Sequence, residues 1–220
     1  MDLVLLIPAF IICFFLLYLL CKQDFVLLRQ NISLNQILDA ALLTVFTAYI
    51  VGRLLFLFNN FDLSLLNIIR FFHVIKFPGL SYLGFFLGGL IALWVVFRNK
   101  KSALRIFDIF SISFFPLFFL SLLFRHYPKD LALVITSLSI TLSVILFVFS
   151  LKSHYKYLLR DGSISLILLI IVSLDTLSYE YLNIKRYILL SGLSLSQILG
   201  ICFTSIGIVL LLINQKKVKI

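Results

Sequence analysis

The stretch LVLLIPAFIICFFLLYLL, residues 3–20, contains no charged side chain and would be apolar on every side of a helix. Residues 84–97 form a second run of the same kind. A helix of a water-soluble domain keeps one face polar, so helices that are apolar all round need lipid or protein on every side. The whole chain agrees, because 62% of its residues are hydrophobic, only 13% are charged and its mean hydropathy is +1.16. These values predict an integral membrane protein.

The apolar runs also predict the number of helices, since about twenty residues cross the hydrocarbon core of a bilayer. On that length the chain has about seven spans, and we expect an all-α, polytopic transmembrane bundle that forms one domain over residues 1–220. The expected helices are residues 3–20, 35–58, 80–97, 106–124, 131–151, 163–182 and 189–213. The first run has no basic region before it and no small-x-small site after it, so we expect a membrane helix and not a signal peptide.

The only long connection between the expected helices is residues 59–79. Within it, residues 63–74 repeat apolar side chains, with Arg70 and His73 on one helical side. This pattern predicts a short amphipathic helix that lies along the membrane surface.

Lysine and arginine predict the orientation, because cationic connections stay on the cytoplasmic side. Connections one, three and five and the C-terminal tail carry twelve of these residues: Lys22, Arg29, Arg98, Lys100, Lys101, Arg105, Lys152, Lys156, Arg160, Lys216, Lys217 and Lys219. The other connections carry six: Arg70, Lys76, Arg125, Lys129, Lys185 and Arg186. The N-terminus is therefore expected outside the cytoplasm and the C-terminus inside it.

The distribution of charge and the spacing of the cysteines give no support to nucleic-acid binding or to a metal or disulfide site. The net charge of +10 is spread over short clusters between apolar runs, which argues against nucleic-acid binding. Cys13, Cys21 and Cys202 lack metal-type or disulfide-type spacing, and we expect them to be small residues of the core.

Arg53 is the first candidate for function, because an ionisable group at membrane depth is costly to insert. It is expected about two turns from the outer end of its helix, where a guanidinium could reach a lipid phosphate. The alternative is that Arg53 only anchors the end of the helix.

Four carboxylates lie in or near the expected helices. Asp39 and Asp108 come close to the cytoplasmic starts of their helices, which favours capping of backbone N–H groups over catalysis. Asp175 and Glu180 are five residues apart and therefore on different helix faces, which argues against an acid/base pair.

The three histidines, His73, His126 and His154, occur singly in expected connections, and His154 is on the other side of the membrane from the first two. We expect ordinary surface histidines and no metal site. The chain contains neither a Walker loop nor a GxSxG motif.

Three segments occur in order along the chain: IVGRLLFLFNN at residues 50–60, GLSYLGFFLGGLI at 79–91 with RNKK at 98–101 and then Asp108, and LSLSQILG at 193–200. Together they resemble motifs of the bacterial prolipoprotein diacylglyceryl transferase family. The family's versions are G-A-R or G-G-R-x-G-Y-V-L-F-Y-N, then G-M-S-F-H-G-G-L-I-G with R-R-x-K and an Asp, and finally I-S-M-G-Q-I-L-S.

The resemblance implies a function in the bacterial plasma membrane. Members of this family transfer a diacylglyceryl group from phosphatidylglycerol to the thiol of a lipobox cysteine, forming a thioether and releasing glycerol phosphate. The expected partners are phosphatidylglycerol or another anionic lipid and lipobox-bearing preproteins, and no cofactor is implied. The residues expected to bind the lipid headgroup are Arg53, Tyr82, Gly84, Arg125 and Glu180.

The chain departs from the family's pattern at several positions. The histidine of the H-G-G motif falls on Leu83, and the tyrosine of the first motif falls on Phe56. The family's G-R-x-G-N-F-x-N-G-E is not found, which leaves Arg125 as a substitute for its arginine. A later family arginine falls on Thr176 if Glu180 is the glutamate that follows it. The catalytic residues therefore stay unassigned.

Three hypotheses follow. The first is a divergent, shortened transferase of this family, and the second is a catalytically inactive descendant that serves as a lipid-binding or partner-binding scaffold. The third is a small transporter or assembly subunit that resembles the family only in membrane composition.

Overall fold

The computed structural model describes residues 3–22, 24–60, 71, 80–123, 129–182 and 193–216. The helices in these residues are α1 (Leu3–Lys22), α2 (Phe25–Arg29), α3 (Leu34–Asn60), α5 (Tyr82–Phe97), α6 (Ala103–Ser113), α7 (Phe115–Leu123), α8 (Lys129–Lys156), α9 (Ser163–Leu182) and α10 (Leu195–Lys216). The predicted all-α membrane bundle is confirmed at this level.

Four segments in the described part of the chain are long and apolar enough to cross a membrane: Leu34–Phe58, Ala103–Leu120, Ser163–Tyr181 and Leu195–Lys216. Two shorter apolar segments accompany them: Pro8–Lys22, which is part of α1, and Tyr82–Phe97, which is α5.

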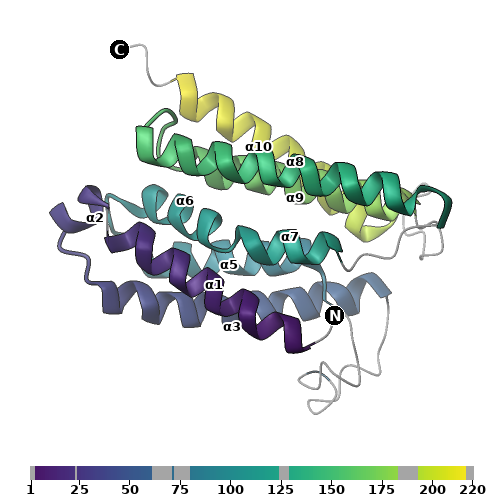
Figure 1. Cartoon of the computed structure of the whole chain (residues 1–220), viewed down its shortest axis with the longest axis horizontal. Coiled ribbons are helices and arrows are strands. Elements are labelled where there is room, and N and C mark those ends of the chain that lie inside the picture. Colours follow the sequence, from purple (N-terminus) through teal and green to yellow (C-terminus); the bar gives the residue numbers. More distant parts are fainter. Residues whose placement is uncertain are drawn as a thin grey trace.

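Successive long helices run in alternate directions along one axis (Figure 1). One end of the bundle, where α1, α5, α8 and α10 finish, gathers most of the lysines and arginines of the described residues: Lys22, Arg29, Arg98, Lys100, Lys101, Arg105, Lys152, Lys156, Arg160 and Lys216. We call it the cationic end, and the end where α3 and α9 finish the opposite end. Which end faces the cytoplasm stays a prediction.

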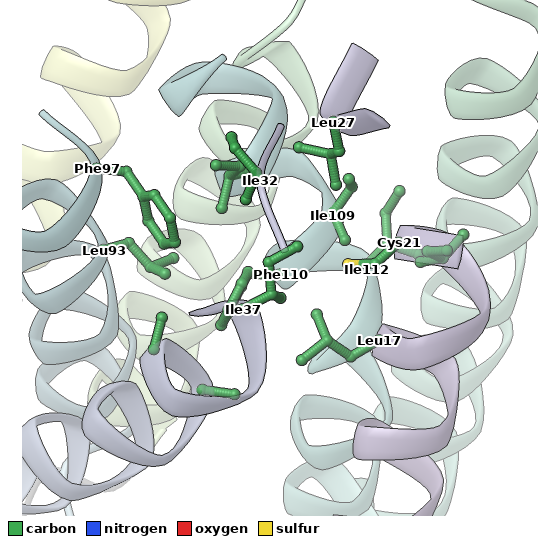
Figure 2. Close-up of a cluster of buried hydrophobic side chains, with 14 of the residues drawn as sticks. Leu17, Cys21, Leu27, Ile32, Ile37, Leu93, Phe97, Ile109, Phe110 and Ile112 are labelled. Carbon is green, nitrogen blue, oxygen red and sulfur yellow. The ribbon is translucent and has the colours of Figure 1, made fainter. Parts of the chain in front are cut away.

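A cluster of buried apolar side chains ties α1, α2, α3, α5 and α6 together near the cationic end (Figure 2). It includes Leu17 of α1, Leu27 of α2, Ile37 of α3, Phe97 of α5 and Ile109 of α6. The α6 helix lies in the middle of the bundle, since it packs against α1, α5, α8 and α9.

The single helix expected over residues 106–124 is interrupted, because α6 ends at Ser113 and α7 begins at Phe115. Pro116 explains the break. A proline has no backbone N–H to donate to the preceding turn, and its ring clashes with a carbonyl there. The amide of Leu117 donates instead to Phe114 O at 3.2 Å, which is a tighter turn than an α-helix.

The short helix α2 was not predicted from the sequence. Its N-cap is Asp24, whose carboxylate accepts hydrogen bonds from Val26 N at 2.9 Å and Leu27 N at 3.3 Å. The amphipathic helix expected over residues 63–74 falls outside the described residues except at Phe71.

The cysteines are only partly as expected. Cys13 and Cys21 are buried, as the sequence predicted, whereas Cys202 is exposed on α10. The prediction of a core position is wrong for Cys202.

Small residues let α3 and α5 approach closely. A Cβ built on Gly84 would lie 3.0 Å from Gly52 Cα, and one on Gly88 would lie 2.8 Å from Ala48 Cα. Gly84 and Gly88 are four residues apart, as are Ala48 and Gly52, so two small-xxx-small faces meet. In lipid, such close packing replaces the hydrophobic effect as the main attraction between helices.

Substitution of Gly88 by alanine is expected to destabilise the protein by about 1–3 kcal/mol, which is typical of overpacking. The new methyl group would lie 2.8 Å from backbone atoms of Ala48 and Thr47. These atoms can give way only if the α3 helix itself shifts. Gly89→Ala is the matched control, because its Cβ would meet only Thr44 Cγ2 at 3.4 Å. Thermal unfolding in detergent should show a lower midpoint for Gly88→Ala alone, and equal midpoints would contradict the close contact.

Candidate functional site

Four of the five residues expected to bind the lipid headgroup belong to the half of the bundle at the opposite end. Arg53 is in the second half of α3, Tyr82 is the first residue of α5, Gly84 follows two residues later, and Glu180 is close to the end of α9. Arg125 lies outside the described residues.

The guanidinium group of Arg53 lies inside the protein, with the residue only 1% exposed. Its Nε donates a hydrogen bond to Phe71 O at 3.0 Å, and its Cζ lies 6.0 Å from the centre of the Phe71 ring. A permanently charged group in such a place needs nearby polar partners. Arg53 is thus directed to the interior of the protein and not to its surface.

Tyr49, one turn earlier on α3, donates a hydrogen bond to the same carbonyl. Its hydroxyl donates to Phe71 O at 2.8 Å, and its ring meets the Phe71 ring edge-on at 6.3 Å. The carbonyl of Phe71 therefore accepts from two side chains of one helix face.

The start of α5 is bonded to α3 beside Arg53. Ser81 N donates to Gly52 O at 3.1 Å, and the Ser81 hydroxyl caps α5 by accepting from Gly84 N at 3.3 Å. Gly84 permits the approach, since a side chain there would meet Leu55 Cδ1 at 2.9 Å. Tyr82, which is half-buried, is positioned by this junction.

Leu83, on which the family's histidine falls in the motif resemblance, is 1% exposed. It packs against Phe115, Leu168 and Val172 from α7 and α9. This position offers no group that could bind or release a proton.

Glu180 is buried and joins two helices. Ser196, at the start of α10, donates its hydroxyl to Glu180 Oε1 at 3.3 Å. One turn earlier on α9, Thr176 donates to Val172 O of its own helix at 2.7 Å. The threonine on which a family arginine would fall, if Glu180 is the glutamate that follows it, thus has a local partner.

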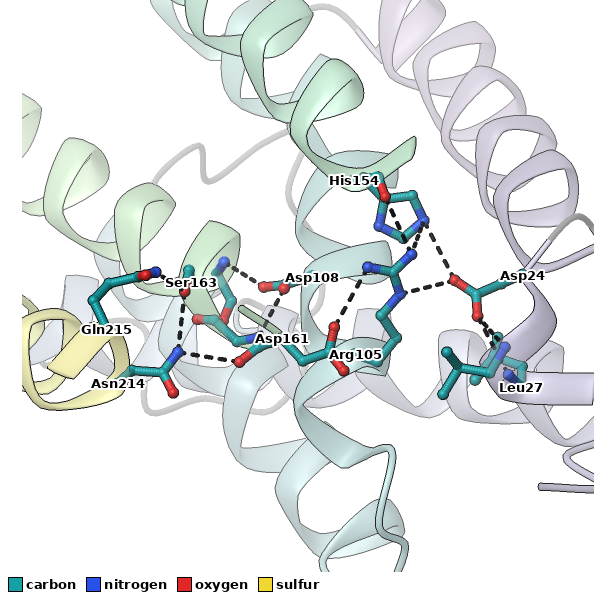
Figure 3. Close-up of polar contacts among 12 residues, drawn as sticks. Asp24, Leu27, Arg105, Asp108, His154, Asp161, Ser163, Asn214 and Gln215 are labelled. Carbon is teal, nitrogen blue, oxygen red and sulfur yellow. Dashed lines mark hydrogen bonds and ion pairs between the residues drawn. The ribbon is translucent and has the colours of Figure 1, made fainter. Parts of the chain in front are cut away.

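A second polar cluster, at the cationic end, was missed by the sequence analysis. Its centre is Arg105 of α6, whose Nε donates to Asp24 Oδ2 at 2.8 Å (Figure 3). Nη1 donates to Asp161 Oδ1 at 3.4 Å, and Nη2 lies 3.2 Å from His154 Nε2 and donates to His154 O at 3.3 Å. The Tyr157 ring lies 4.6 Å from Cζ. We call these five residues the Arg105 network.

Asp108 caps a helix, but not its own as the sequence predicted. It lies inside α6 and accepts from Gly162 N at 2.7 Å and Ser165 N at 2.8 Å at the start of α9 (Figure 3). Arg105 meanwhile contacts the last turn of α8. One turn of α6 therefore places a cation at the negative end of α8 and an anion at the positive end of α9. Asp39 is exposed on α3, and it caps no helix in the part of the chain that the structure describes.

His154 is not the surface histidine that was predicted. It lies in the last turn of α8, beyond the expected span at residues 131–151, and its side chain is 3% exposed. Because a guanidinium can only donate, the contact of Arg105 with Nε2 favours the neutral tautomer that has its proton on Nδ1. Burial and then the charge of Arg105 lower the pKa of His154 to about 4, while Asp24 acts in the opposite direction.

The stability of the protein is expected to depend on His154 between pH 6.5 and about 4. An unfolded chain takes up a proton on this histidine below pH 6.5, whereas the folded chain does so only near pH 4. The contribution, of order 3 kcal/mol, is therefore complete above pH 6.5 and lost as the pH falls. As the pH falls from 6.5 to about 4, wild type should lose about 3 kcal/mol of stability that His154→Gln does not lose, and parallel pH profiles of the two unfolding midpoints would contradict this.

Comparison with known proteins finds a family model that matches the first half of the chain. The family model for prolipoprotein diacylglyceryl transferase matches residues 4–121, which is more than half of the chain and extends from α1 into α7. The match includes Arg53, Tyr82 and Gly84, whereas Arg125 and Glu180 lie beyond it. No curated protein and no solved structure matches the chain. The chain belongs to the prolipoprotein diacylglyceryl transferase family.

Proposed function

We propose that this protein binds phosphatidylglycerol, or another anionic phospholipid, at the opposite end of the bundle and transfers its diacylglyceryl group to the thiol of a lipobox cysteine in a preprotein. The observation that carries the proposal is the buried guanidinium of Arg53 beside the α3–α5 contact, within the part of the chain that matches the family. The protein would act in the bacterial plasma membrane.

The reaction explains why a cation is needed. The cysteine sulfur forms a bond to a glyceryl carbon while the bond from that carbon to a phosphate oxygen breaks, so glycerol phosphate leaves with the electron pair. The proton of the thiol passes to a base. Donors aimed at the departing phosphate stabilise this transition state, and arginine suits phosphate because its planar group can donate two parallel hydrogen bonds.

A second candidate is a family member that binds the lipid but does not transfer it. Leu83 supports this alternative, because a family histidine is replaced there by a side chain packed among Phe115, Leu168 and Val172. Thr176, on which a family arginine would fall if Glu180 is the glutamate that follows it, donates a hydrogen bond within its own helix. Family membership argues against the third hypothesis, a resemblance through membrane composition alone.

The test is transfer of a labelled diacylglyceryl group from phosphatidylglycerol to a lipobox peptide by the purified protein. An active member of the family is assayed in parallel, together with a peptide whose lipobox cysteine is serine. We expect a thioether-linked product with the cysteine peptide only. If the parallel enzyme forms product and this protein does not, transfer is refuted, and retention of phosphatidylglycerol then decides for or against the scaffold.

A further inference from the structure

The cationic end carries apolar side chains where a water-exposed surface would be polar. On α2 these are Phe25 and Leu28, and at the end of α8 and directly after it they are Tyr155, Tyr157 and Leu158, each more than half exposed. Four exposed cations accompany them: Lys22 at the end of α1, Arg29 at the end of α2, and Lys152 and Lys156 on α8. We call these nine residues the α2–α8 surface.

The two parts of this surface are held side by side, although they are far apart in the sequence. Asp24, which precedes Phe25, and His154, which precedes Tyr155, both contact Arg105 and lie 3.5 Å apart at Oδ2 and Nε2 (Figure 3). The Tyr157 ring rests on the same guanidinium at 4.6 Å. A buried ion network thus fixes the backbone from which the exposed side chains project.

The depth of the surface follows from where the apolar helices stop. The shorter apolar helix Pro8–Lys22 ends beside it, and the candidate span Ala103–Leu120 begins within one turn of Arg105. The expected span at residues 131–151 ends just before Lys152. Three apolar segments therefore reach their boundary at one level, which is the depth at which aromatic side chains and lysines meet lipid headgroups.

We propose that the α2–α8 surface binds anionic phospholipids of the cytoplasmic leaflet, as a site separate from the proposed substrate site around Arg53. The four cations would contact the headgroups while Phe25, Leu28 and the tyrosines enter the boundary with the acyl chains. The two carboxylates of the network do not oppose this charge, because Asp24 is buried and Asp161 is paired with Arg105. A soluble anion would satisfy the cations but leave the apolar side chains uncovered, so we favour lipid.

The chain offers a direct probe, because Trp94 is its only tryptophan. In a Trp94→Phe background, Phe25→Trp places one fluorophore on the α2–α8 surface. The protein is reconstituted in bilayers that contain phosphatidylserine or phosphatidylcholine brominated on the acyl chains, at equal mole fractions. We expect the brominated phosphatidylserine to associate with the surface about fivefold more favourably, measured from quenching of this tryptophan.

Two sets of variants decide the origin of that preference. Replacement of Lys22, Arg29, Lys152 and Lys156 by glutamine should abolish it, whereas Arg53→Gln should leave it unchanged and separate it from the proposed substrate site. Equal quenching by both lipids would overturn the recognition of anionic lipid. Absence of quenching by either lipid would overturn the membrane contact itself, and loss of the preference in Arg53→Gln would refute a second site.

Discussion

Substitution of Arg53 by alanine is expected to weaken the binding of phosphatidylglycerol about 10- to 100-fold, the range for a lost hydrogen bond to a charged group. If the protein is a transferase, the rate of transfer should fall at least as far, because the same cation would stabilise the departing phosphate. Binding is measured with radiolabelled phosphatidylglycerol in detergent at several salt concentrations, and transfer with the lipobox peptide.

The control for this prediction lies one turn away on the same helix. Tyr49 and Arg53 donate to the same carbonyl, Phe71 O, at 2.8 and 3.0 Å. Tyr49→Phe removes one of these hydrogen bonds without a change of charge, so it measures the structural part of the effect. Arg53→Lys keeps the charge but loses the two-pronged geometry of the guanidinium, and an intermediate loss is expected.

The comparison of the three variants separates recognition of the lipid from support of the fold. If Tyr49→Phe and Arg53→Ala lose lipid binding equally, the role of Arg53 is to hold the Phe71 carbonyl, and the proposed headgroup site is wrong. If binding survives in both, lipid recognition does not involve this end of α3 at all. Thermal midpoints of all variants show whether the folded state is retained.

The long helices could be predicted because each depends on local composition. The run expected over residues 163–182 is the helix Ser163–Leu182, and the run over residues 35–58 is the helix Leu34–Asn60. A bilayer demands about twenty apolar residues and internally satisfied backbone groups, so length and hydropathy alone identify such segments. The break after Ser113 was also visible in principle, since Pro116 lies inside the expected helix.

The contacts between helices could not be predicted in the same way. The Arg105 network joins residues 24, 105, 154, 157 and 161, which no periodicity connects. Polar residues in connections were assumed to be solvated, and this assumption made His154 a surface residue. The signal that was available is Asp24, an N-cap residue directly before an apolar run, which favours a short helix such as α2.

In the candidate headgroup site, too, the positions of the residues along the bundle could be predicted, whereas their partners could not. The order and direction of the helices suffice to place Arg53, Tyr82, Gly84 and Glu180 in one half of the bundle. The partners of these residues, such as Ser196 for Glu180 and Phe71 O for Arg53, depend on how the helices pack.

Replacement of Asp24 by asparagine is expected to lower the free energy of unfolding by about 3 kcal/mol, because it leaves the charge of a buried Arg105 without its nearest carboxylate. Asparagine keeps an oxygen that can accept from Val26 N and Leu27 N, so the cap of α2 survives in this variant. Asp24→Ala removes the cap as well and should cost about 1 kcal/mol more. Unfolding is followed by circular dichroism in mixed micelles with increasing denaturing detergent.

Asp39→Asn is the matched control, since Asp39 has the same charge and is exposed on α3. If Asp24→Asn is no less stable than Asp39→Asn, the buried pair contributes nothing to the folded state. The double variant Asp24→Leu with Arg105→Met tests the reason for the loss. Breaking a buried pair is costly mainly through the charge left behind, so removal of both partners should recover most of the stability that the single substitution loses.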